Sequence, residues 1–112
     1  MTIDPEELNV LAEKLHKPLE RYLKWKIIVD RYKRGKDSKI AQLGLQYQDR
    51  SVSERDRMAE ASPEFISYLS EWHEAEKKMS AAQIEYETIK AKFDALQSVL
   101  AYMRDSMRRL GG

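Results

Sequence analysis

Side chains able to perform acid, base or metal chemistry are sparse in this sequence. The chain has no cysteine and two histidines, His16 and His73, which fall in separate helical stretches without acids at metal-ligand spacing. Glu71, Glu74 and Glu76 flank His73, but a run of acids on a helix is normally solvated, and a di-metal bundle needs Glu-x-x-His pairs on further helices. There is also no glycine-rich phosphate loop. We therefore expect a protein that is not an enzyme and that holds neither a metal nor a cofactor.

Electrostatic binding of a polyanion is the chemistry that residues 17–50 suggest. This segment has ten basic and four acidic side chains, although the formal net charge of the chain is only +1. Aromatic residues interleave with the basic ones, and single-stranded nucleic acid is commonly held by Lys and Arg on its phosphates and by rings stacked on its bases. The pattern favours a binder of single-stranded nucleic acid with little sequence preference. The predicted nucleic-acid-binding residues are Arg21, Tyr22, Lys24, Trp25, Arg31, Tyr32, Lys33, Arg34, Lys36 and Lys39.

The same aromatic residues also have a structural interpretation. Trp25, Ile28 and Tyr32 recur at the i, i+3, i+7 spacing of one helix face. Their side chains would then pack in a core while the basic side chains stay in solvent. The spacing is compatible with both interpretations.

A long helix near the end of the chain is the main element that the sequence predicts. Only three prolines and four glycines interrupt 112 residues, of which 35% are charged, and this is typical of a helical protein. Ser62, Pro63 and Glu64 form a helix start, with a capping hydroxyl, a proline at the first position and an acid in the first turn. A helix from Pro63 to Leu110 would extend roughly 70 Å, which is too long to bury against the rest of the chain.

Apolar residues in this helix, beginning with Phe65, Leu69 and Trp72, alternate at spacings of three and four, which is a heptad pattern. The alternation breaks around Glu76 and Met79, where we predict a stammer. A second stripe of mostly small residues lies beside the first, so the face is wider than a two-stranded coiled coil needs, and we predict a homo-oligomeric bundle or ring. Packing of both stripes within one chain is the alternative. The predicted oligomerisation residues are Tyr86, Ile89, Phe93, Leu96, Leu100, Met103 and Met107. The second stripe consists of Ile84, Thr88, Ala91, Ala95, Ser98 and Tyr102.

The amino-terminal half reads as shorter helices. Asp4 and Pro5 open the first, by the same capping logic, and Pro18 ends or kinks it after about three turns. A second helical run begins at Leu19. Around Gly35 the pattern fits either a continuous helix or a turn.

Together these elements predict an all-α fold in which short N-terminal helices precede one long heptad-bearing C-terminal helix that assembles as a helical oligomer. Residues 48–53 lose periodicity and form the expected linker, followed by a short polar helix over residues 53–61. We expect two regions, a basic and aromatic one over residues 1–52 and a packing and oligomerisation region over residues 53–112. No stretch resembles a signal peptide or a membrane span, so we expect a cytoplasmic protein without a membrane partner.

The order of these features resembles the recombination mediators of tailed bacteriophages, the UvsY-like proteins. The matching parts are the Tyr22 to Trp25 step in a basic helix, the run from Leu43 to Tyr47, the polar connector and the long C-terminal helix. The family's basic Lys-x-Arg step before the later tyrosine is absent here, because residues 42–45 are uncharged.

The resemblance implies a non-enzymatic accessory protein of recombination or replication. Such small helical subunits form rings, bind single-stranded DNA and help to load a RecA-type recombinase onto strands covered by single-strand-binding protein. By this resemblance Lys24 and Trp25 belong to the DNA-binding face, the long helix serves assembly, and the cytoplasm is that of a bacterial host. A coiled-coil interaction or phage assembly protein that does not bind nucleic acid is the alternative.

Overall fold

The computed structural model describes residues 5–111, which form helices and turns and contain no strand. Helix α1 spans Pro5–Gly44, a short 3-10 helix η1 spans Leu45–Tyr47, α2 spans Val52–Glu60 and α3 spans Pro63–Gly111. The predicted all-α fold with one long carboxy-terminal helix is therefore confirmed.

The chain divides into two compact units, and each contains part of α1 and part of α3. The central unit is Leu23–Ser80. The terminal unit consists of Met1–Tyr22 and Ala81–Gly112, of which residues 5–22 and 81–111 are described. The boundary expected between residues 52 and 53 stays a prediction.

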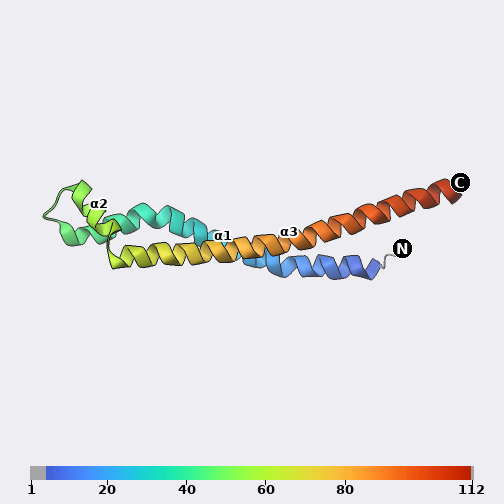
Figure 1. Cartoon of the computed structure of the whole chain (residues 1–112), viewed down its shortest axis with the longest axis horizontal. Coiled ribbons are helices and arrows are strands. Elements are labelled where there is room, and N and C mark those ends of the chain that lie inside the picture. Colours follow the sequence, from blue (N-terminus) through green and yellow to red (C-terminus); the bar gives the residue numbers. More distant parts are fainter. Residues whose placement is uncertain (1–4, 112) are drawn as a thin grey trace. The chain divides into compact units, whose positions relative to one another are not determined.

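In the central unit the two long helices run antiparallel, and α2 lies between the end of α1 and the start of α3 (Figure 1). Its core is small. Ile40 and Leu43 of α1, Ala59 of α2 and Phe65 of α3 are buried together. Tyr68 packs against this cluster from the next turn of α3. All three α-helices of the central unit therefore contribute to one apolar core.

Helix α3 begins as its sequence predicts. The Ser62 Oγ accepts a hydrogen bond from the Phe65 backbone N–H at 3.3 Å and donates one to the Ala59 carbonyl at 2.6 Å. Pro63 takes the first helical position and Glu64 lies in the first turn. The predicted cap is confirmed, and it also ties the start of α3 to α2.

The predicted short polar helix is present as α2. It begins at Val52, where the Ser51 Oγ caps it by accepting the Glu54 N–H at 3.3 Å. Its alternating charges predict a solvated surface, but Ala59 is completely buried. Helix α2 therefore covers the core as well as facing solvent.

Helix α1 is 40 residues long and differs from the prediction because it continues through Pro18. At Gly35 it follows the continuous-helix alternative. A proline inside a helix removes one hydrogen bond and costs about 3 kcal/mol or more. The Pro18 side chain is fully buried in the terminal unit, and this apolar burial helps to offset the cost. The predicted end of a short helix at Pro18 is therefore wrong, and the alternative of a kink there stays a prediction. The predicted cap Asp4 lies outside the described residues.

The apolar register of α3 also differs from the prediction in the central unit. The buried or half-buried apolar positions are Phe65, Tyr68, Trp72, Ala75 and Met79, at unbroken spacings of three and four. The predicted stripe ran through two different residues, Leu69, which is 38% exposed, and Glu76. With Tyr68 and Ala75 in those places, the spacing requires no stammer.

Replacing the core residue Phe65 with Ala should destabilise the protein by about 3–5 kcal/mol, because it removes a large side chain that is 3% exposed. The matched control is Ile66→Ala, one residue along and 58% exposed, for which we expect less than about 1 kcal/mol. Urea unfolding of the two variants measures both values. Equal losses would contradict the burial described for α3.

Candidate nucleic-acid interface

Five basic side chains gather on nine residues of α1 in the central unit. Residues 31–39 contain these five and one acid, Asp37. Four of the five are exposed and Lys39 is half-buried. None of them takes part in an ion pair with any residue that the structure describes. We call this group the α1 basic cluster: Arg31, Lys33, Arg34, Lys36 and Lys39.

The predicted aromatic partners of these cations pack inside the central unit. Trp25 and Tyr32 are half-buried. The Lys78 Nζ of α3 lies 4.6 Å from the Trp25 ring centroid, and the Lys24 Nζ lies 5.6 Å from it. The Tyr32 ring meets the Tyr68 ring edge to face, with centroids 5.1 Å apart. The structure therefore gives these rings partners within the chain, as the structural interpretation of their spacing expects.

The two remaining predicted binding residues belong to the terminal unit. The Arg21 Nη2 lies 2.9 Å from the Glu85 Oε2 in an exposed ion pair. Tyr22 is half-buried. Arg21 is thus already neutralised by an acid of α3, in contrast to the α1 basic cluster.

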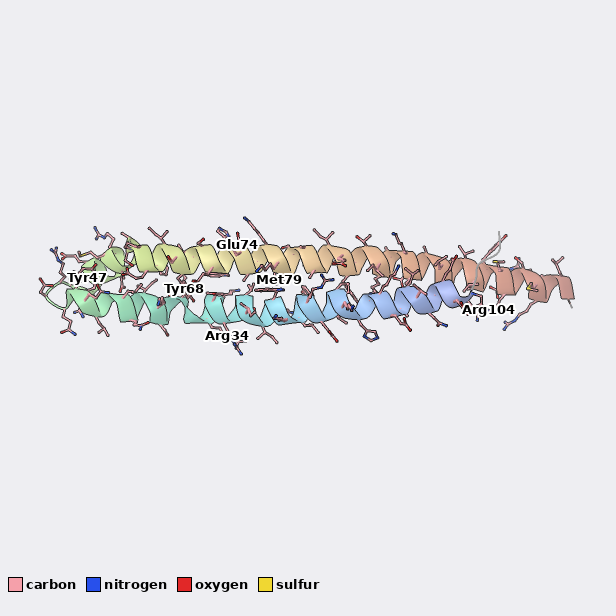
Figure 2. The ribbon with its side chains drawn as sticks, turned by 90° about the horizontal axis from the view of Figure 1, so that it is seen from below. Arg34, Tyr47, Tyr68, Glu74, Met79 and Arg104 are labelled. Atoms are coloured by element: carbon pink, nitrogen blue, oxygen red, sulfur yellow. The ribbon has the colours of Figure 1, made fainter. Side chains whose placement is uncertain are left out.

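A close approach between the two helices organises the site. The Tyr68 hydroxyl donates a hydrogen bond to the Tyr32 backbone carbonyl. A Cβ at Gly35 would lie 3.2 Å from the Tyr68 Oη, which is tighter than most such contacts. Gly35 therefore gives the hydroxyl room. In Figure 2, Tyr68 lies between the two ribbons, whereas Arg34 points away from them.

Two grooves of opposite character open beside Tyr32. The first, here the Gly35 groove, is a cavity of about 450 Å³ with apolar walls from Ile28, Tyr32 and Tyr68. Its polar lining is Arg31, Ser38, Lys39 and Gln42. The second, here the Glu71 groove, has about 260 Å³ and is lined by Trp25, Glu71, Glu74 and Lys78 among others. The first groove has two cations and no carboxylate, whereas the second has two carboxylates and one cation, Lys78.

The two tyrosine hydroxyls are held in their neutral form. Burial raises the pKa of Tyr32 above its usual 10.0, and its hydrogen bond to the Glu71 carboxylate, 3.2 Å long, raises it further. Burial also raises the pKa of Tyr68. Both hydroxyls therefore act as donors, one to Glu71 and one to the backbone of α1.

Sequence reasoning missed several groove residues. Ser38 and Gln42 lie on exposed positions of α1 and carry no charge, so no pattern marks them. Tyr68 was passed over because the predicted stripe ran through Leu69. The sequence contained one signal for this groove: Gly35, a glycine in the interior of a basic helical segment.

The predicted oligomerisation residues lie on α3 in the terminal unit. Six of the seven are half-buried, and Met107 is 72% exposed. Leu96 lines a cavity of about 410 Å³ together with Val10 and Leu11 of α1. The residues of the second stripe are all exposed, including Ile84 at 65% and Tyr102 at 73%. Within one chain, α1 therefore covers part of the first stripe and leaves the second uncovered.

Other kinds of site are not found in the part of the chain that the structure describes. Within residues 5–111, no three His, Cys, Asp or Glu side chains are grouped so that they could ligate a metal ion. No helix in the same range combines the length and apolar character needed to cross a bilayer. No protein-family model, curated protein or solved structure matches the chain. The resemblance to phage recombination mediators stays a prediction.

The contact at Gly35 can be measured by a double-mutant cycle. Ala is favoured over Gly in a helix by about 1 kcal/mol, and a hydrogen bond contributes about as much. Gly35→Ala alone should therefore leave the free energy of unfolding nearly unchanged, since it gains propensity and disturbs the Tyr68 hydroxyl. In a Tyr68→Phe background it should stabilise by about 1 kcal/mol. Equal effects in both backgrounds would show that Gly35 and Tyr68 are not coupled.

Stability should fall as the pH rises above 10. The folded state holds the Tyr32 and Tyr68 protons more tightly than the unfolded state does, because both pKa values are raised from 10.0. The stabilisation that these two tyrosines contribute is complete below pH 10 and is lost as the pH rises through their raised folded-state pKa values. Thermal unfolding across this range should show a shallower decline for Tyr68→Phe than for the exposed control Tyr102→Phe. Identical pH profiles for both variants would contradict the assignment.

Proposed function

We propose that this protein is a non-enzymatic, single-stranded DNA-binding accessory of recombination or replication that acts as a homo-oligomer. The α1 basic cluster provides the electrostatic attraction to phosphates. A RecA-type recombinase and a single-strand-binding protein are the partners that the resemblance to UvsY-like mediators implies. The site favours binding with little sequence preference, because its charges are point contacts on a helix surface.

The observation that carries this proposal is the lack of compensation in the α1 basic cluster. Ion pairs elsewhere in the described chain join Arg21 with Glu85, Arg50 with Glu54 and Lys77 with Glu74. The α1 basic cluster instead gathers, within nine residues, five cations without an ion pair to any described residue. Five cations without an ion pair repel one another, which opposes folding. They also form a local positive patch on a chain whose net charge is +1. Such a patch is explained most directly by a polyanionic partner.

Assembly completes the proposal because one cluster offers few contacts. Linking several weak sites in one particle raises their joint affinity when all can engage the same strand. The exposed second stripe of the terminal unit is the surface we assign to contact between copies. Its small residues, such as Ala91 and Ala95, allow close approach of another helix.

The second candidate is a protein-interaction module that does not bind nucleic acid. The exposed apolar side chains of α3, including Ile84 and Tyr102, favour this alternative. In that case the stripe docks a different protein, and the basic cluster meets an acidic surface.

Neutralising the α1 basic cluster should abolish most of the DNA binding. Each phosphate contact to a single strand contributes about 0.7 to the slope of log affinity against log salt, so replacing all five residues with Gln should reduce the slope by up to about 3.5. Fluorescence anisotropy of labelled oligo-dT over a salt series measures the slope. Light scattering on the same sample should give a mass above that of one 13.2 kDa chain.

A control variant with the same change in net charge separates the site from a general effect. It replaces five exposed basic residues of α3 in the terminal unit with Gln: Lys90, Lys92, Arg104, Arg108 and Arg109. The control variant should keep most of the slope of log DNA affinity against log salt, because it leaves the α1 basic cluster intact. Equal losses in both variants would remove the site assignment, and no binding by the unaltered protein would favour the interaction module.

A further inference from the structure

We infer that the Gly35 groove receives one nucleotide of the bound strand, with its phosphate between Arg31 and Lys39 and its base against Tyr32 and Tyr68. This inference rests on the proposed binding of single-stranded DNA and adds a defined subsite to it. It also changes the expected stacking residues, since Trp25 lines the other groove.

Charge selects the Gly35 groove over its neighbour. Tyr32 forms part of both grooves, so either could present its ring to a base. The Glu71 groove contains one cation, Lys78, but would place a phosphate near the two carboxylates of Glu71 and Glu74, which repel it. The Gly35 groove presents Arg31 and Lys39 instead, and neither has an ion-pair partner among the described residues. A ligand with a negative group and a flat apolar part suits this groove.

The shape of the groove fits one nucleotide. Its volume of about 450 Å³ lies within the range of small-molecule sites, roughly 300–1,000 Å³. Its apolar wall combines Ile28 with the two tyrosine side chains, and its polar edge adds the Ser38 hydroxyl and the Gln42 amide. Aromatic stacking accepts any base, whereas a hydroxyl and an amide can meet its polar edge.

Gly35 keeps the groove open. It is the residue of the lining that lacks a side chain, and a Cβ at this position would lie 3.2 Å from the Tyr68 Oη. Tyr68 is held by its hydrogen bond to the Tyr32 carbonyl and by stacking on Phe65, with ring centroids 5.8 Å apart. The rings of the subsite are thus fixed before a nucleotide binds, which lowers the entropy lost on binding.

The test compares two pairs of substitutions in the full chain. Arg31→Ala with Lys39→Ala removes the groove cations, whereas Lys33→Ala with Arg34→Ala removes two cations of the same helix outside the groove. A second comparison leaves the charge unchanged: Ser38→Leu narrows the groove, and Ala41→Leu adds the same side chain at an exposed position outside it. Oligo-dT affinity is measured by anisotropy, and circular dichroism confirms that each variant is folded.

The variant without the groove cations Arg31 and Lys39 should lose about ten-fold more oligo-dT affinity than the variant without Lys33 and Arg34. A difference of this size is expected when the contacts to one base are lost together with the phosphate contacts. Ser38→Leu should weaken binding about ten-fold and Ala41→Leu should leave it unchanged. Equal losses for the two charge pairs, together with unchanged binding by Ser38→Leu, would overturn the subsite and leave the proposed function standing. Absence of oligo-dT binding by the unaltered protein would overturn both.

Discussion

The hydrogen bond from the Tyr68 hydroxyl to the Tyr32 carbonyl sets the relation of α1 to α3 in the central unit. A backbone carbonyl within a helix can accept a second hydrogen bond, and Gly35 leaves room for the donor to reach it. The same ring stacks on Phe65, which belongs to the core with Ile40. Because this core is small, the hydrogen bond beside it contributes strongly to determining which residues of α1 and α3 contact each other.

The separation of the acidic groove from the basic groove follows from this hydrogen bond between Tyr68 and Tyr32. Tyr32 is held with its hydroxyl toward Glu71, and Glu71 and Glu74 line one groove beside its ring together with Lys78. Arg31 and Lys39 lie on the other side, around Gly35. A register shift of one turn would bring different acids and bases together. The packing of the rings therefore decides where a negatively charged ligand could approach this part of the helix pair.

Local chemistry in the sequence was sufficient to predict where α3 begins, because Ser62 and Pro63 act on the backbone next to them. It was insufficient to predict the length of α1. The free-energy cost of Pro18 within the helix is offset in part by burial of its side chain, and that burial depends on residues distant in the sequence. The stripe through Leu69 and Glu76 breaks the heptad spacing, whereas the stripe through Tyr68 and Ala75 keeps it, so the observed register of α3 was present in the sequence and was missed. The basic residues could be found from composition, but the grooves depend on which residues of α3 lie opposite Gly35, and no local pattern encodes that.

In the proposed function, binding and assembly fall to different residues of the same two helices. The α1 basic cluster lies in the central unit, and the exposed stripe with Ala91 and Ala95 lies in the terminal unit. Five cations limit one chain to a few phosphate contacts, so its affinity would fall steeply with salt. Several copies joined through the stripe would present the cluster repeatedly, and the second contact on a strand would then form at a high effective concentration. This separation would let assembly strengthen binding without changing the groove beside Gly35.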